Sequence, residues 1–326
     1  MEQKTKLYLV IPCYNEEKVI GKTAEVLLRK MQQMQEKSLI SGGGKIVFVN
    51  DGSKDKTWSM IEQLHRDNPV FEGVNLSRNR GHQNALLAGL MTVKNYADAV
   101  VSMDADLQDD VDVLDEFVGR FQEGYDIVYG VRSTRQKDTY FKKHSAMFFY
   151  RLMHMLGVEV VSNHADYRLL SRRVLMELEN YREVNLFLRG IVPLVGFEST
   201  NVYYERHERF AGESKYPLKK MISFAVDGIT SLSSKPIHLI SLAGIGIFFF
   251  TVIYVFYLMI GHFFFGRAVQ GWTSLMVSIW GVGGLELLAI GIIGEYVGKT
   301  YLETKSRPRY IVKEYLKEEE EGNEQA

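Results

Sequence analysis

Short apolar runs alternate with helical patterns along the first 235 residues of the chain. Turn residues bound the runs, and the stretches between them repeat apolar positions every three or four residues, as amphipathic helices do. Strands that alternate with helices in this way predict an α/β domain with a largely parallel sheet, covered on both faces. The predicted strands are Leu7–Pro12, Lys45–Val49, Gly73–Leu76, Ala99–Met103 and Ile127–Tyr129, and the predicted helices include Thr57–Arg66, Asn84–Val93 and Val113–Gln122.

The pattern changes from Pro236 onward, where two long apolar runs follow each other. Ile237–Phe265 and Trp272–Val297 are almost uncharged, and each is long enough to cross a hydrocarbon core of about 30 Å as a helix. Lysines and arginines flank the pair on both outer sides, whereas the short loop between the runs holds only Arg267. The positive-inside rule therefore predicts two transmembrane helices with both termini in the cytoplasm.

Two further segments, Tyr140–Leu156 and Tyr216–Leu232, mix apolar and basic side chains. We expect amphipathic helices at the membrane interface there, with ordinary core packing as the alternative. The chain is accordingly expected to divide into four parts. These are a cytoplasmic α/β domain over 1–213, an amphipathic juxtamembrane segment over 214–235, two transmembrane helices over 236–298 and a basic-then-acidic cytoplasmic tail over 299–326.

Composition narrows the class of protein further. The formal net charge is -1, which offers no general electrostatic attraction for nucleic acid. The one cysteine, Cys13, excludes an internal disulfide and a cysteine-cluster metal site, and its apolar surroundings predict a buried thiol. Met1–Lys6 is short and charged and leads directly into a strand. We therefore expect no secretory signal peptide and a location at the cytoplasmic (inner) membrane.

Polar clusters follow the predicted strands. Because ligands of open α/β sheets bind outside the carboxyl ends of the strands, these clusters are expected to meet at one edge. No P-loop competes, since Ile46 stands where Ser or Thr would be needed, and no zinc-protease or nucleophile-elbow pattern is present. The clusters are Tyr14-Asn15-Glu16, Asp51-Gly52-Ser53, Ser77-Arg78-Asn79 and Asp104-Ala105-Asp106.

The pair Asp104 and Asp106 carries the most specific chemical signal. Period-two geometry sends both carboxylates to the same side of the strand end, and the amide of Gln108 follows two residues later. Hard divalent cations prefer oxygen ligands, and Mg²⁺ usually takes one or two carboxylates together with substrate phosphates. A solvated acidic turn is the alternative that these residues leave open.

Several motifs together resemble a known family. Pro12-Cys13-Tyr14-Asn15-Glu16-Glu17, Asn50-Asp51-Gly52-Ser53 and Asp104-Ala105-Asp106-Leu107-Gln108-Asp109 resemble family 2 glycosyltransferases of GT-A fold, whose catalytic domain is Rossmann-like. Ser77–Gln83, Ala165–Leu170 and Arg209–Tyr216 look like the polyprenyl-phosphate glycosyltransferases, which include dolichyl-phosphate mannose synthase and bactoprenol glucosyltransferases. Two apolar runs ending in Gly294–Lys299 look like the bactoprenol branch. The resemblance covers nearly everything before the acidic tail.

The resemblance implies a role for each candidate residue. Nucleotide contacts are implied for Pro12, Tyr14, Glu16, Asp51 and Ser53, and a Mg²⁺ or Mn²⁺ site for Asp106, Asp104 and Gln108. Arg132, Arg209 and Lys215 are implied to contact phosphate or the acceptor. An ordinary turn with a helix cap is the alternative for Asp51–Ser53, and solvated charge is the alternative for Arg209 and Lys215.

Catalysis is implied for Asp166, Arg168 and Asp104, with Asp166 as the family's candidate base. A lipid monophosphate has a second pKa of about 6 and is mostly dianionic at neutral pH, so it needs little deprotonation. Asp166 is therefore also considered as a carboxylate that orients the acceptor or neighbouring arginines. His82 and His164 are expected to be structural hydrogen-bonding residues.

The implied function is that of an inverting, metal-dependent glycosyltransferase. It would move a hexose from a nucleotide diphosphate sugar, UDP-glucose in the first place, to undecaprenyl phosphate at the cytoplasmic membrane face, for cell-envelope glycan modification. A flippase would act on the product, and Glu286 inside the second run favours a homo-oligomer. Transfer of N-acetylglucosamine, galactose or mannose stays open. A processive polysaccharide synthase and a non-catalytic sugar-nucleotide sensor are the more distant alternatives.

Overall fold

The computed structural model describes residues 4–133, 164–184, 186–205, 230, 233–265 and 271–318 of the 326-residue chain. The chain forms two compact units. The first comprises Met1–Tyr150, Val160–Pro217 and Arg307–Ala326, and the second comprises Arg151–Glu159 and Leu218–Ser306. The residues from Arg307 onward, after the second apolar run, thus belong to the same unit as the α/β domain.

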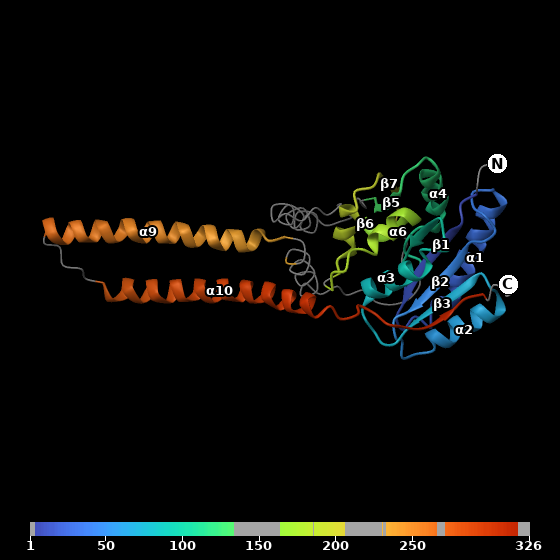
Figure 1. Ribbon diagram of the computed structural model, residues 1–326, viewed down its shortest axis with the longest axis horizontal. Coiled ribbons are helices and arrows are strands. Elements are labelled where there is room, and N and C mark those ends of the chain that lie inside the picture. Colours follow the sequence, from blue (N-terminus) through green and yellow to red (C-terminus); the bar gives the residue numbers. More distant parts are fainter. Residues whose placement is uncertain are drawn as a thin grey trace, which may run out of the picture. The chain divides into compact units, whose positions relative to one another are not determined.

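The first unit is built on an eight-stranded mixed sheet with the strand order β7-β5-β6-β4-β1-β2-β3-β8 (Figure 1). Strands β4, β1, β2 and β3 run parallel in the centre, whereas β6 is antiparallel to β4 and β5, and β8 is antiparallel to β3. The strands are β1 Leu7–Cys13, β2 Lys45–Asn50, β3 Phe71–Leu76, β4 Ala99–Ser102, β5 Ile127–Arg132, β6 His164–Ser171, β7 Ser199–Tyr204 and β8 Val312–Leu316.

The prediction of a largely parallel sheet describes the centre and misses the two antiparallel strands. β6 was not predicted because its sequence, His164–Ser171, places charged side chains among apolar ones. β8 has the sequence Val-Lys-Glu-Tyr-Leu and lies at an edge of the sheet, where polar side chains can stay exposed to solvent. Neither segment shows the continuous apolar run of a central parallel strand.

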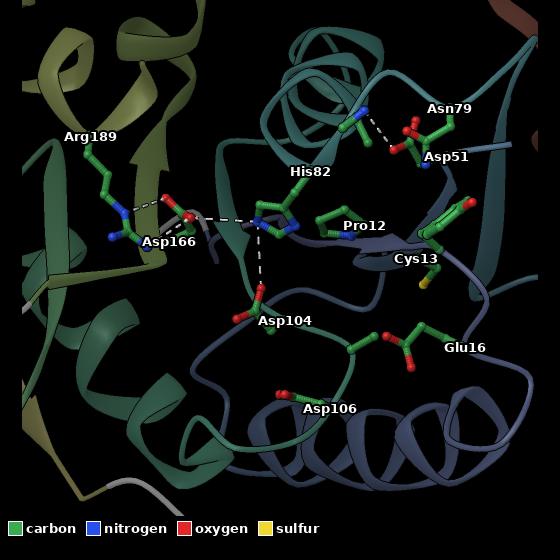
Figure 2. Close-up of a pocket in the computed structure, with 14 residues that line it drawn as sticks. Pro12, Cys13, Glu16, Asp51, Asn79, His82, Asp104, Asp106, Asp166 and Arg189 are labelled. Atoms are coloured by element: carbon green, nitrogen blue, oxygen red, sulfur yellow. Dashed lines mark hydrogen bonds and ion pairs between the residues drawn. The ribbon is translucent and has the colours of Figure 1, made fainter. Parts of the chain in front are cut away.

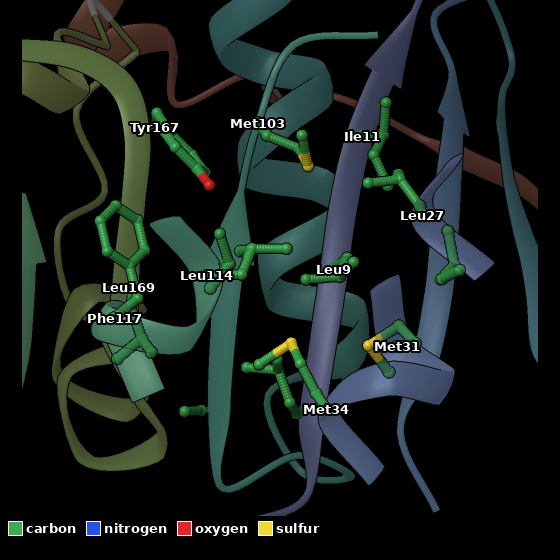
Figure 3. Close-up of a cluster of buried hydrophobic side chains, with 14 of the residues drawn as sticks. Leu9, Ile11, Leu27, Met31, Met34, Met103, Leu114, Phe117, Tyr167 and Leu169 are labelled. Carbon is green, nitrogen blue, oxygen red and sulfur yellow. The ribbon is translucent and has the colours of Figure 1, made fainter. Parts of the chain in front are cut away.

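Helices cover both faces of the sheet, as the sequence predicts. Alternate residues of β1 divide between two cores: Leu9 and Ile11 pack on one face, and Tyr8 and Val10 on the other. Figure 3 shows the first core, with side chains from β1, β6, α1 and α4. That face carries α1 Ile20–Glu36, α2 Thr57–Asp67 and α4 Leu114–Gln122, and the other carries α3 His82–Val93, α6 Arg172–Leu178 and α7 Leu188–Leu194.

The second unit contains two long helices that lie side by side, α9 Lys235–Phe265 and α10 Trp272–Lys305 (Figure 1). By length and composition, Lys235–Tyr254 and Ser278–Lys305 are apolar enough to cross a membrane, with mean hydropathies of 2.1 and 1.4. The Tyr296 hydroxyl donates to the Ser233 carbonyl at 2.6 Å. Two apolar C-terminal helices are thus confirmed. The predicted interface helix Tyr140–Leu156 and nearly all of Tyr216–Leu232 lie outside the described residues.

Candidate active site

A polar cavity of about 530 Å³ opens at the carboxyl ends of β1, β2 and β4, where the sequence predicts a ligand site (Figure 2). Seven of the predicted site residues line it: Pro12, Tyr14, Glu16, Asp51, Asp104, Asp106 and Asp166. The other lining residues are Cys13, Asn79, Gly81, His82, Ala85, Ala105 and Arg189. Segments separated by up to 177 positions (12 to 189) therefore form one site.

The loop after β1 is fastened to the turn after β2. The Asn15 amide donates to Ser53 Oγ at 3.0 Å, and the Glu16 amide donates to Thr57 Oγ1 at 2.9 Å. Tyr14 is left 44% exposed at the cavity, which suits an aromatic ring that stacks on a base. Ser53 is not among the residues that line the cavity, and its hydroxyl holds the loop that presents Tyr14 and Glu16.

Asp51 organises the loop between β3 and α3. Its two carboxylate oxygens accept the amides of Arg80 at 2.7 Å and Gly81 at 2.9 Å. Burial raises the pKa of Asp51, and these two hydrogen bonds oppose that rise. The Asp51 side chain still lines the cavity, so it shapes this edge and is within reach of a ligand.

The acidic loop after β4 presents Asp104 and Asp106 to the cavity. Asp106 Oδ1 accepts the backbone amide of Gln108 at 3.2 Å, and Leu107 between them has a positive φ of 53°. The Gln108 side chain is 8% exposed and does not line the cavity. From the other side, the Thr23 hydroxyl donates to the Ala105 carbonyl at 2.6 Å and holds the loop.

The acidic loop fits a hard divalent cation that also binds substrate phosphates. Among the residues that the structure describes, no three His, Cys, Asp or Glu side chains form a ready metal cluster. Mg²⁺ commonly takes one or two carboxylates and completes its shell with phosphate oxygens and water. Asp104 and Asp106 supply such carboxylates at an open cavity, whereas Gln108 supports Asp106 through its backbone.

Asp166 lines the same cavity and is surrounded by basic side chains (Figure 2). Arg168 Nη2 lies 2.5 Å from its Oδ1, and Arg189 makes two contacts, from Nε at 3.3 Å and from Nη2 at 3.2 Å. His82 Nε2 lies 3.6 Å from both Asp166 and Asp104. The sequence predicts a structural role for His82. It gives no signal for Arg189, because a single arginine among apolar residues shows no link to Asp166.

These contacts set the protonation of the cluster. Burial would raise the pKa of Asp166, but the interaction with His82 and the charges of Arg168 and Arg189 hold it well below its usual value. Burial lowers the pKa of His82, and its interactions with Asp166 and Asp104 more than compensate and raise it above 6.5. Asp166 is therefore ionised at neutral pH, which makes it a weak proton acceptor.

The predicted basic residues have different outcomes. Arg168 is 1% exposed and does not line the cavity, so it acts on the site through Asp166. Arg132 binds the buried Asp109 at 3.3 Å and the Tyr204 hydroxyl at 3.2 Å and is not among the lining residues. Arg209 and Lys215 lie outside the described residues.

A mixed α/β sheet with a carboxylate-lined cavity at its strand ends defines a GT-A-like glycosyltransferase fold. The chain belongs to a family of this class, since the model of "Glycosyl transferase family 2" matches residues 8–179. The protein is therefore a glycosyltransferase enzyme, and the recognition of the family from its motifs is confirmed.

Relatives match nearly the whole chain. It is 50% identical over 309 residues to an uncharacterized glycosyltransferase of Bacillus subtilis (strain 168), YkoT, covering 94% of this chain and 90% of that one. It is 37% identical over 313 residues to the prophage bactoprenol glucosyl transferase homolog of Escherichia coli (strain K12), covering 96% and 100%. It is 38% identical over 309 residues to the bactoprenol glucosyl transferase of Shigella phage SfX, covering 94% and 99%.

Among solved structures, glucosyl-3-phosphoglycerate synthase from Mycobacterium tuberculosis, in complex with Mn²⁺, UDP and glucosyl-3-phosphoglycerate, aligns with a TM-score of 0.42. The identity is 17%, and the alignment covers 70% of this chain and 78% of that one.

Proposed function

We propose that this enzyme is an inverting glycosyltransferase that moves glucose from UDP-glucose to undecaprenyl phosphate at the cytoplasmic face of the membrane. The observation that carries the proposal is one cavity, in which the carboxylates Asp104 and Asp106 lie opposite the Asp166–Arg189 pair. Relatives named bactoprenol glucosyl transferase, alignable over nearly the whole chain, support the acceptor and the sugar. The two apolar helices support a membrane anchor.

Asp106 and Asp104 would hold Mg²⁺ or Mn²⁺ beside the donor diphosphate. When bound, the cation stabilises the negative charge that develops on the departing nucleotide. Tyr14 and Pro12 would hold the base, with Glu16 and Asp51 near the ribose. Ser53 would support this edge through the loop that it ties.

The transfer step needs little proton movement. A phosphate oxygen of the acceptor forms a bond to the anomeric carbon while the bond from that carbon to the β-phosphate oxygen breaks and UDP leaves. The acceptor's second pKa is about 6, so it arrives mostly as the dianion. Asp166, held ionised by Arg168, Arg189 and His82, would then orient Arg189 toward the acceptor phosphate instead of removing a proton.

Replacement of Arg189 tests this role for Asp166. We expect Arg189→Gln to raise the KM for undecaprenyl phosphate by about tenfold, since a charged hydrogen bond to phosphate is worth about 1.5–3 kcal/mol. Arg189→Lys, which keeps the positive charge, should raise the KM less. If Asp166 were a base, removing a cation would raise its pKa and make it more basic, so an unchanged or faster reaction would contradict the orienting role.

The remaining assignments complete the proposal. Arg132, Arg209 and Lys215 would contact phosphate or the acceptor, with Arg132 released from Asp109 when it does so. A homo-oligomer in the membrane and a flippase that receives the lipid-linked sugar are also proposed. The catalytic domain and both termini would face the cytoplasm.

Purified full-length protein in detergent tests the function directly. Labelled UDP-glucose, UDP-galactose, UDP-N-acetylglucosamine and GDP-mannose are each incubated with undecaprenyl phosphate and Mg²⁺ or Mn²⁺, with EDTA as the control. A single-sugar lipid product from UDP-glucose alone is expected. Product from another donor would show that the enzyme transfers a sugar other than glucose. A polymer would favour a processive synthase, and binding without turnover would favour a sugar-nucleotide sensor.

A further inference from the structure

The segment after α10 returns to the α/β unit and completes its sheet. β8 runs antiparallel to β3, with Leu316 opposite Gly73 and Val312 opposite Leu76. Here the segment Arg307–Glu318 is called the return strand. It lies outside the part of the chain that the family model matches, residues 8–179.

Side chains anchor the return strand at several points. The Tyr315 hydroxyl donates to Glu72 Oε2 at 2.5 Å, and Glu318 pairs with Lys45 at 2.5 Å. Arg309 Nη1 donates to the Tyr181 carbonyl at 2.8 Å, and the Lys317 ammonium lies 4.0 Å from the centroid of the Tyr96 ring. These contacts reach β2, β3 and the ends of two helical segments, so the position of the return strand is specified by much more than backbone pairing.

One contact connects the return strand to the candidate active site. The Ser77 amide donates to the Ile311 carbonyl at 3.0 Å. Ser77 opens the loop that continues through Asn79 and Gly81, two of the cavity-lining residues, into His82 at the start of α3. The loop is therefore held at its first residue by Ile311 and at Arg80 and Gly81 by Asp51.

The same loop also packs closely against the turn after β2. A Cβ atom at Gly52 would lie 2.5 Å from the Asn79 nitrogen, so at this point the backbone of the turn after β2 packs directly against the backbone of the loop. A displacement of Ser77 would therefore be transmitted to Asn79 and Gly81, because close-packed groups do not deform freely.

We propose that the return strand is a positioning element of the nucleotide-binding edge. It holds Ser77 and the end of β3, and thereby sets Asn79, Gly81 and His82 relative to Asp51 and Asp104, without touching substrate itself. This rests on the proposed function in one respect, that the cavity binds a nucleotide diphosphate. A consequence is that the donor site is complete only after the chain beyond α9 and α10 has been made and has folded back.

The position of the return strand separates this role from a general role in stability. β8 is an edge strand, and Val312, Lys313 and Glu314 are exposed. None of the fully buried residues of the two cores comes from the return strand, although Tyr310 and Tyr315 pack against the second core. We therefore expect the strands β7 to β3 and most of both cores to stay in place when it is removed. The expected effect is thus weaker donor binding by a folded protein.

Truncation of the full-length protein provides the test. One variant ends at Ser306 and lacks the return strand, and a matched control ends at Glu318 and lacks only 319–326. Both are purified in detergent, and UDP binding in the presence of Mn²⁺ is measured by calorimetry together with the melting temperature. We expect the Kd for UDP to rise about tenfold in the first variant, the loss that one or two fixing hydrogen bonds produce. The control should bind like the wild type, and a synthetic peptide of residues 307–318 should restore affinity to the first variant.

A second variant covers the case in which the shorter protein fails to fold. Val312→Pro removes an amide and disfavours the strand beside Ile311, and exposed Lys313→Ala is its control. Equal UDP affinity in folded Val312→Pro or in the shorter protein would overturn the proposal. Failure of the wild type to bind either UDP or GDP would instead refute the nucleotide site, and the positioning role with it.

Discussion

At the scale of single residues, the site depends on which partner each carboxylate binds. Asp166 is occupied by two guanidinium groups and an imidazole, which keep it ionised. Asp51 binds two backbone amides, and Asp106 binds one. Asp104 and Asp106 are therefore the carboxylates in the best position to bind a cation, whereas Asp51 and Asp166 hold neighbouring groups in place.

Asp106 provides the most direct test of the metal assignment. Asp106→Ala is expected to lower transfer at least a hundredfold while folding and membrane insertion are preserved, since charge stabilisation by the cation would be lost. Activity against Mn²⁺ concentration measures this, and Asp67→Ala, at an exposed carboxylate that ends α2, is the control. Full activity in Asp106→Ala would exclude Asp106 as a ligand.

His82 should produce a measurable pH dependence of stability. Its pKa is raised in the folded protein, so the stabilisation that it contributes is complete below pH 6.5 and declines as the pH rises through the folded value. The side chain is 43% exposed, so screening by solvent keeps the effect small. We expect the melting temperature, measured in EDTA, to fall less between pH 6.5 and 8.5 in His82→Gln than in the wild type. Parallel curves would contradict the ion pairs.

At the scale of elements, strand ends and the first residues of helices form the site. The turn after β2, the loop after β3 and the acidic loop after β4 each contribute side chains, and backbone contacts hold them in register. Loops can hold such geometry because the parallel strands that precede them are buried and rigid.

Gly52 tests the close approach between two of these elements. It has a φ of 63°, and an added Cβ would meet the Asn79 nitrogen at 2.5 Å. Gly52→Ala is therefore expected to lower the free energy of unfolding by about 1–3 kcal/mol and to weaken UDP binding. Gly42→Ala is the matched control, because nothing lies within 4 Å of its added Cβ and its φ is not positive. Equal unfolding free energies and equal UDP affinities of Gly52→Ala and Gly42→Ala, measured by chemical denaturation and calorimetry, would show that the loop contact is unimportant.

At the scale of the whole molecule, the α/β unit is completed by chain on both sides of the two apolar helices. Residues before α9 provide seven strands of the sheet, and residues after α10 provide the eighth. If both helices cross the membrane, the two stretches must meet on one side of it. The positive charges flanking the apolar runs predict that this is the cytoplasmic side.

Thiol labelling tests this topology. The single native cysteine, Cys13, is buried, so background labelling should be low. Arg267→Cys, in the loop between the apolar runs, is expected to react with a membrane-impermeant maleimide in intact cells. Lys22→Cys, on the exposed side of α1, should react only after lysis. Protection of the first or labelling of the second would contradict a cytoplasmic catalytic unit.

The class of fold, the family and many of the cavity residues could be predicted from the amino-acid sequence. Buried parallel strands have continuous apolar runs, and the residues that follow them must meet at one edge, so Tyr14, Asp51 and Asp104 could be placed together from local pattern alone. The two apolar helices were equally evident, because length and hydropathy are local properties.

The contacts between distant segments could be identified only once the chain was seen folded. Arg189 and His82 converge on Asp166 from α7 and α3, and Arg132 pairs with Asp109. Strand β8 pairs with β3 across 236 to 243 positions of sequence, from Leu76 with Val312 to Gly73 with Leu316. Edge strands and ion pairs leave no periodic signal, since each depends on a partner far along the chain. The physical reason is the same in each case: local pattern records which face a residue buries, and long-range packing selects its partner.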